Sequence, residues 1–136
     1  MPNSVSFGVG AGQFSSGMGY NTYIGQNAGK GLGLTNLNSG IRNTFIGYGA
    51  GINNTTGNGN IIIGSDAGYQ QTTGNNNIFI GNGSGCEDEG ILSGSIFIGA
   101  HAGFNLCSSN TLVIDNQEND YPLLWGDFAL DQQKFN

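Results

Sequence analysis

Apolar and β-branched residues recur along the chain in clusters of three, each preceded by Asn or Ser and closed by Gly. The clusters read NTYIG at 21–25, NTFIG at 43–47, NIIIG at 60–64, NIFIG at 77–81 and SIFIG at 95–99, with a weaker copy, SVSFG, at 4–8. The six closing glycines are separated by 17, 22, 17, 17 and 18 residues. Short β-branched runs closed by Gly predict strands that end in tight turns. A fixed period predicts stacked repeats.

The extra residues of the longer units fall on one side of the repeat. They lie in KGLGLTNL at 30–37 and in CEDEG at 86–90. Loops of stacked coils accept insertions in this way without losing strand register. Polar stretches such as INNTTGN return the chain to the next cluster, so each unit of about 17 residues predicts one coil with two short strands and two turns. The fold class predicted is therefore all-β, a parallel β-roll or β-helix.

Strand alternation separates the apolar positions into two columns that face opposite ways. We expect the aliphatic column to fill the inside of the coil: Ile24, Ile46, Ile63, Ile80 and Ile98. The second column would then lie outside a single chain: Tyr23, Phe45, Ile62, Phe79 and Phe97. Because burying each large side chain is worth roughly 1.5 to 3 kcal/mol, this second column predicts an interface between identical chains, an intertwined or side-by-side homotrimer.

Two further columns support the stack. Asn residues precede four of the strands and predict an amide ladder along the coils: Asn21, Asn43, Asn60 and Asn77, followed by Ser95. Small residues followed by Gly mark the sharp turn of each coil: Ala28, Ala50, Ala67, Ser84 and Ala102.

The repeat divides the chain into three parts. Residues 1–20 form a loosely matching N-terminal coil, residues 21–115 carry the β-coil repeats, and residues 116–136 form a C-terminal cap or a junction to a further domain. The last part differs in composition, because 25 of the 26 Gly lie at or before Gly103 and the only Trp is Trp125. A solenoid needs such a cap over its open end.

Charge and hydropathy exclude several classes of function. The 136 residues have a formal net charge of −6 and only three Lys or Arg, which form no basic stripe for nucleic acid. No apolar run of 18 residues predicts a membrane span, and no secretory signal begins the chain.

The two cysteines, Cys86 and Cys107, form no CxxC motif and have no cluster of His nearby. Each follows the turn of a successive repeat. At a strand spacing of about 4.8 Å their Cα atoms come within disulfide range. The sequence leaves two alternatives open, a bond or two packed free thiols.

The phrase NTFIGYGAG at 43–51, followed by TTGN at 55–58, resembles the repeats of phage tail-fibre and injection-system fibre proteins. It is also similar to the head repeats of trimeric autotransporter adhesins. The resemblance covers about residues 4–115. It implies a homotrimeric shaft or receptor-binding tip that attaches to a host or cell surface without catalysis. It also implies an extracellular location, on a virion tail fibre or injection-system fibre, with a bacterial surface adhesin head as the alternative.

Two roles follow from this resemblance. A receptor-binding module would recognise a cell-surface glycan or protein through side chains such as Tyr20, Tyr48 and Tyr69. A purely structural trimeric shaft segment would bind no ligand.

Other chemistry finds less support in the residues. The IG phrases resemble the hexapeptide of left-handed β-helix acyltransferases, with His101 as a base, but that family needs continuous hexads. The acidic run Glu87, Asp88 and Glu89 offers carboxylates for Ca²⁺ without the EF-hand spacing. An ice-binding face would need Thr columns and an outward column that is not aromatic. We predict no enzyme activity, no catalytic residues, no metal ligands and no cofactor other than this Ca²⁺ alternative.

Overall fold

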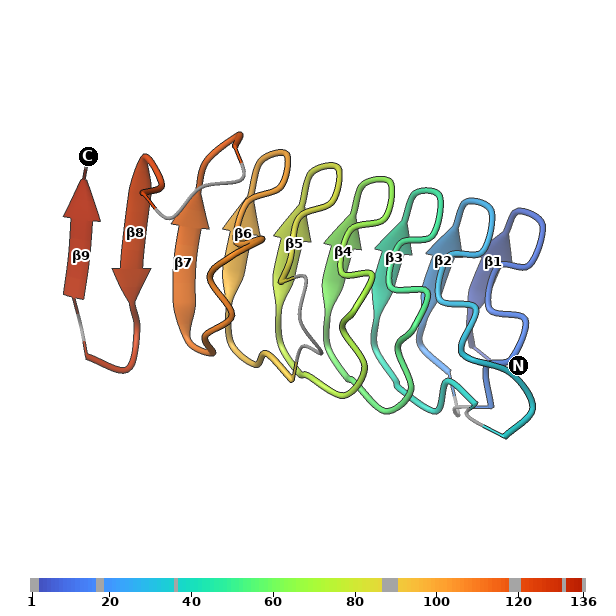
Figure 1. Ribbon diagram of the computed structural model, residues 1–136. Helices are drawn as coiled ribbons and strands as arrows, with labels where there is room; N and C mark the ends of the chain where they lie inside the picture. The colour runs from blue at the N-terminus through green and yellow to red at the C-terminus, as the bar shows by residue number, and fades with distance from the viewer. Residues whose placement is uncertain are drawn as a thin grey trace.

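The computed structural model describes residues 3–16, 19–35, 37–86, 91–117 and 121–130, together with the backbone of 132–135. Within these residues the chain is all-β and forms one nine-stranded sheet whose strands lie in chain order (Figure 1). The strands are β1 (Val5–Phe7), β2 (Thr22–Ile24), β3 (Thr44–Ile46), β4 (Ile61–Ile63), β5 (Ile78–Ile80), β6 (Ile96–Ile98), β7 (Thr111–Ile114), β8 (Leu124–Asp127) and β9 (Gln132–Phe135). β1 to β7 are parallel, and β8 and β9 continue the sheet antiparallel.

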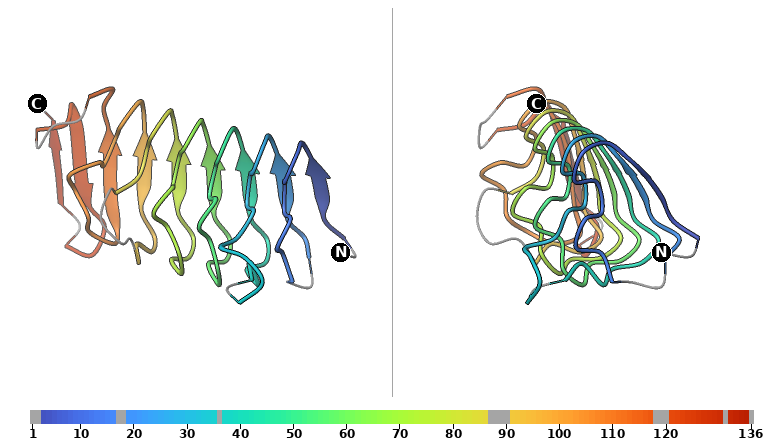
Figure 2. Two further views of the ribbon diagram at one scale, coloured as in Figure 1. Left: turned by 45° about the vertical axis from the view of Figure 1, so that its right-hand side comes forward. Right: turned by 90° about the vertical axis from the view of Figure 1, so that its right-hand side faces the viewer.

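Each repeat forms one coil of a parallel β-solenoid. The view along the stack shows the coils superposed, with the strands along one side (Figure 2). Thr44 pairs with Thr22 on one side and with Ile61 on the other, so equivalent residues fall into columns as the period predicts. The expected second strand of each coil is wrong: the described residues form one strand per coil, and turns and bends complete the circuit.

The interior is filled by the column that was expected outside. Tyr23, Phe45, Ile62, Phe79 and Phe97 all have an exposed fraction of 0%. In contrast, Ile24 is 37% exposed and Ile80 is 36% exposed, and Ile46, Ile63 and Ile98 are only partly buried. The assignment of Ile24, Ile46, Ile63, Ile80 and Ile98 to the coil core is therefore wrong. Tyr23, Phe45, Ile62, Phe79 and Phe97 cannot form an interface between chains, because they are buried within one chain.

The physical reason is the small cross-section of a 17-residue coil. It leaves room for one inward apolar side chain from each strand of β2 to β7, which is an aromatic ring in four coils and Ile62 or Val113 in the other two. Phe79 and Phe97 stack with ring centroids 5.0 Å apart, and Tyr23 and Phe45 lie tilted at 5.6 Å. Aromatic pairs at these separations add favourable energy beyond burial alone.

Glycine makes room for these rings. Gly51 has φ of 55°, and a Cβ placed on it would lie 2.7 Å from the Phe45 ring. Gly47 closes the strand with φ of 134°, and its Cβ would lie 2.6 Å from the carbonyl carbon of Gly64 in the next coil. A side chain at either position would meet both backbone strain and a clash.

The buried asparagines form the expected ladder. Asn60 is 0% exposed, and its Oδ1 accepts a hydrogen bond of 2.9 Å from the backbone N–H of Asn77 in the next coil. Its Nδ2 donates to the carbonyl of Gly74, three residues before Asn77, at 2.8 Å. Asn43 makes the equivalent pair of bonds with Asn60 and Gly57. Each amide thus joins two coils and ties its own coil shut.

A second interior polar column lies on the opposite wall and was not predicted. It consists of Asn38, Asn54 and Gln71, which are at most 2% exposed. Nδ2 of Asn54 donates to Oδ1 of Asn38 at 3.0 Å, and Nδ2 of Asn38 donates to the Tyr23 hydroxyl at 3.2 Å. Burial raises the pKa of Tyr23, and the Asn38 hydrogen bond acts in the opposite direction.

One corner of the coil alternates between glycine and a longer polar side chain. The column runs Gly10, Asn27, Gly49, Asp66, Gly83 and His101, and every member has positive φ. Each polar side chain leans over the glycine of the preceding coil: a Cβ on Gly49 would lie 2.5 Å from Oδ1 of Asp66, and one on Gly83 would lie 2.9 Å from Nδ1 of His101. We name this column the alternating corner.

The C-terminal segment extends the sheet with antiparallel strands. β8 pairs with β7 through partners such as Val113 and Trp125, and β9 pairs with β8. Trp125 packs against the apolar core.

Replacing Asn60 by Asp tests the ladder. The new carboxyl keeps the shape of the amide, but when ionised it presents a negative charge to the Gly74 carbonyl, at an expected cost of about 1 to 3 kcal/mol or more. Burial raises the pKa of this carboxyl above the unfolded value of about 3.9, so the folded state holds its proton to higher pH. The loss of stability relative to wild type is therefore small below about pH 4 and grows as pH rises.

Urea unfolding at pH 3.5 and pH 7, followed by circular dichroism, measures this difference. The matched control is Asn105→Asp, at an exposed position. An equal loss at both pH values for Asn60→Asp, or no loss at pH 7, would contradict the ladder.

Candidate functional site

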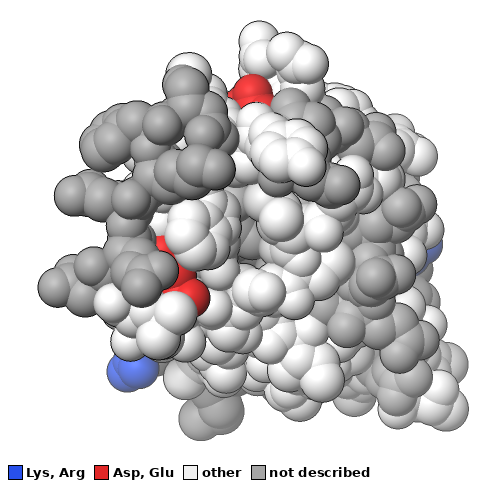
Figure 3. All heavy atoms as spheres, turned by 60° about the vertical axis from the view of Figure 1, so that its left-hand side comes forward, with Lys and Arg blue, Asp and Glu red and all other residues white. Residues whose placement is uncertain are grey.

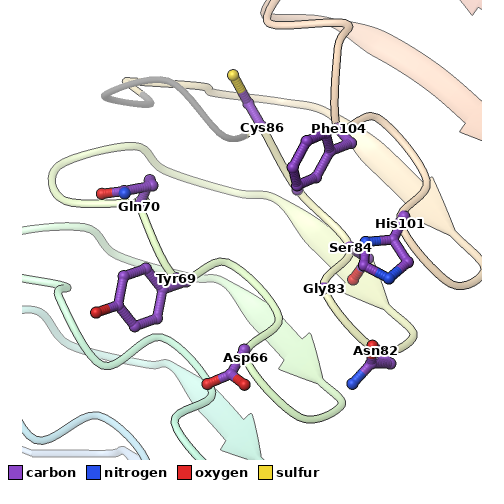
Figure 4. Close-up of a pocket in the computed structure, with 10 residues that line it drawn as sticks. Asp66, Tyr69, Gln70, Asn82, Gly83, Ser84, Cys86, His101 and Phe104 are labelled. Carbon is purple, nitrogen blue, oxygen red and sulfur yellow. The ribbon is translucent and has the colours of Figure 1, made fainter. Parts of the chain in front are cut away.

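A hollow of about 360 Å³ opens at the corners of three successive coils, after β4, β5 and β6 (Figure 4). The coil of β4 contributes Asp66, Tyr69 and Gln70, the coil of β5 contributes the run 82–86, and the coil of β6 contributes His101 and Phe104. All of these residues follow the closing Gly of their strand. Strand register therefore fixes their relative height along the stack.

The hollow exists because its middle coil carries small residues between larger ones. Three residues after each strand, Gly83 lies between Asp66 and His101. Six residues after each strand, Cys86 takes the place that Tyr69 and Phe104 hold in the neighbouring coils. In Figure 4 the sulfur of Cys86 points away from His101 and Phe104. The floor of the hollow therefore consists of short side chains and backbone, and Tyr69 and Phe104 line two of its sides.

Several polar groups of the lining have few partners within the chain. Asp66 accepts a hydrogen bond of 3.3 Å from the Ser65 hydroxyl. The His101 ring lies over Gly83 and makes an edge contact with Phe104 at 5.8 Å between ring centroids. His101 Nδ1 and Ser84 Oγ are both buried without a hydrogen-bond partner. Buried polar atoms without partners are uncommon in folded proteins and call for an explanation.

These groups offer hydrogen bonds and stacking surfaces. No hydrogen bond joins Ser84, His101 and Asp66 into a catalytic relay within the described residues. Nor do three His, Cys, Asp or Glu side chains in the described part of the chain gather as a metal site. The candidate Ca²⁺ ligands Glu87, Asp88 and Glu89 lie outside the described residues.

The three tyrosines predicted as ligand contacts lie in different places. Tyr69 is 47% exposed and forms one wall of the hollow. Tyr48 is 53% exposed and lies one residue before the alternating corner, outside the hollow. Tyr20 is 62% exposed, has φ of 61°, and directly precedes the buried Asn21, away from the other two.

Of Asp66 and His101 the sequence singles out only His101, as the base of an acyltransferase, and the hollow between the two was not predicted. The signal lies in two columns, three and six residues after each strand. In both columns the middle coil carries a small residue, and the coils on either side carry larger ones. Asn82 and Ser84 carried no motif and became candidates only through their place in the structure.

A disulfide joins Cys86 and Cys107, whose Cα atoms are 5.2 Å apart. This settles the alternative that the sequence left open. Cys86 is 7% exposed and belongs to the core cluster, whereas Cys107 is exposed. The bond links the coil of β5 covalently to the loop after β6, next to Phe104.

No family model, curated protein or solved structure matches the chain. The described residues contain no helix long and apolar enough to cross a membrane.

Removing the disulfide by Cys107→Ser is expected to lower the free energy of unfolding by about 3 kcal/mol, because the bond closes a loop of 21 residues in the unfolded chain. Urea unfolding with and without a reductant measures the effect. Reductant should destabilise the wild type and leave Cys107→Ser unchanged. Reactive thiols in unreduced, denatured wild-type protein would show that the bond is absent.

Proposed function

We propose that this chain is a structural and adhesive fibre module, a stiff rod that assembles with identical copies as a homotrimer and attaches to a cell surface without catalysis. The observation that carries the proposal is the outward face of the parallel sheet. Because the middle residue of each strand points inward, its two neighbours in the strand point outward. They form the two columns of this face.

The outward face is uncharged and almost wholly apolar. In β1 to β7 it carries fourteen side chains, of which twelve are apolar and two are Thr: Val5, Phe7, Thr22, Ile24, Thr44, Ile46, Ile61, Ile63, Ile78, Ile80, Ile96, Ile98, Leu112 and Ile114. At its N-terminal end Phe7 is 75% exposed, and in the middle Ile61 is 40% exposed. Seven strands at about 4.8 Å make a strip roughly 29 Å long. A contiguous apolar strip of this kind is typical of an association surface.

A second copy of the same chain is the partner that this strip fits best. Its side chains repeat at the spacing of the coils, and only a partner with the same spacing matches them along the whole length. Cyclic symmetry places the same strip of each chain at a common axis. The number three comes from the resemblance to fibre and adhesin repeats, since the strip itself requires only a partner of equal period.

One further side of the molecule agrees with an assembly that needs no charged ligand. Seen from the C-terminal side, the described surface is mostly uncharged, with a few acidic atoms and fewer basic ones (Figure 3). A trimeric rod exposed on a virion tail fibre, on an injection-system fibre or on a bacterial surface would present this side to the medium.

An ice-binding role gains little from the corrected faces. The aromatic column is internal, so it is no longer an argument against such a role. The outward columns, however, carry Thr only at Thr22 and Thr44, and apolar side chains elsewhere. A shaft without any ligand remains the alternative, and ligand binding separates it from an adhesive module.

Light scattering on the purified chain tests assembly. We expect a mass of three times the 14.1 kDa of the chain at about 10 µM. Ile63→Lys places a charge at the centre of the strip and should raise the dissociation constant at least tenfold, because a buried unpaired charge is strongly unfavourable.

The matched control is Leu34→Lys, at an 83% exposed position outside the sheet, which should leave the mass unchanged. Circular dichroism confirms that both variants keep their β structure. A monomeric wild type, or an Ile63→Lys variant that assembles like the wild type, would refute assembly through this strip.

A further inference from the structure

We propose that the hollow lined by Tyr69 and Phe104 binds a neutral pyranose sugar, which packs against an aromatic side chain and places its hydroxyls on the polar groups of the floor and rim. This inference names a ligand class for the proposed adhesive role. The role of this sugar binding in attachment rests on that proposed function, although the binding itself does not.

The aromatic lining favours a sugar ring. Tyr69 and Phe104 come from coils two apart, and both line the hollow of about 360 Å³. The C–H groups of a pyranose ring pack favourably on the negative faces of aromatic rings.

The hollow between the walls stays open for the reasons already given. Coil β5 has no side chain at Gly83, and its Cys86 is drawn into the disulfide with Cys107. The half-exposed Tyr69 ring therefore presents apolar surface beside the hollow. Concave sites that combine apolar walls with a few convergent polar groups are the usual form of small-molecule sites.

The polar groups match neighbouring hydroxyls. The Asp66 carboxylate accepts hydrogen bonds, whereas the Asn82 and Gln70 amides both donate and accept. Asn82 is exposed, and its Nδ2 makes only a long bond of 3.3 Å to the Ser65 carbonyl. A hydroxyl-rich ligand supplies both donors and acceptors to such a set.

Charge separates neutral sugars from other small polar molecules. The lining contains one carboxylate and no Lys or Arg. Phosphates and sialic acids would place their negative charge near Asp66 without a compensating cation. The hollow thus favours neutral hexoses and N-acetylhexosamines.

Titration of the isotope-labelled full chain, followed by amide chemical shifts in NMR, tests the proposal. The probes are glucose, galactose, mannose and N-acetylglucosamine, each to about 50 mM, with N-acetylneuraminic acid as the anionic probe. We expect at least one neutral sugar to cause saturable shifts at Gly83, Ser84 and His101, with a dissociation constant on the order of 1 mM, as is usual for a ligand of this size. The anionic probe should bind more weakly.

Variants locate the binding. Tyr69→Ala removes one wall and should raise the dissociation constant at least tenfold, and Asp66→Asn should raise it several-fold. The matched control Tyr48→Ala removes an equally exposed tyrosine outside the hollow and should leave it unchanged. The proposal is overturned if no sugar gives saturable shifts at these residues, or if Tyr69→Ala binds like the wild type.

Light scattering on the same samples keeps the two proposals apart. A trimer that binds no sugar overturns the ligand site and favours the shaft. A monomer that binds sugar through Tyr69 supports the ligand site and refutes the assembly.

Discussion

Each coil from β2 to β7 has room for only one large apolar side chain from its strand, and the rest of this structure depends on that constraint. The place is taken by the middle residue of each strand, from Tyr23 to Val113. Opposite it the coil needs a residue without a side chain, which explains Gly51 against the Phe45 ring and the small Ala50 beside it. The remaining interior belongs to buried amides such as Asn43 and Asn60, whose hydrogen bonds join successive coils. The buried apolar side chains therefore form one continuous row along the axis of the stack.

The arrangement of the strands follows from the sequence through its period. Spacing between the closing glycines predicts the coil length, the parallel register and the columns, because stacked strands require equal residues at equal heights. The same spacing predicts the amide ladder and the small residues of the turn. None of these needs knowledge of long-range packing.

Which strand face lies inside does not follow from alternation alone, because both faces are apolar. A decisive signal was nevertheless available. Asn21 and Tyr23 are two residues apart and so share a face, and an amide ladder contributes most when it is shielded from water. Those two facts place the aromatic column inside and leave Ile24 and its equivalents outside. The second amide column, with Asn38 and Asn54, comes from the irregular return segments and has no comparable pattern.

The hollow was harder to foresee because it arises where the repeat is imperfect. A motif search weighs each residue by its type, and by that measure Tyr20, Tyr48 and Tyr69 are equivalent. Their difference lies in the neighbouring coils: only beside Tyr69 does the next coil carry a short side chain at the same height, with a second aromatic ring beyond it. The disulfide of Cys86 reinforces this difference, since it holds the short side chain out of the gap.

At the alternating corner the contacts repeat every two coils. Asn27, Asp66 and His101 each lie over a glycine of the coil before, and those glycines come from the intervening coils. Loss or gain of a single coil would bring two long polar side chains, or two bare glycines, into contact at this corner. Loss or gain of two coils would leave every contact there intact. At this corner the repeating unit of the contacts is therefore a pair of coils, about 34 residues.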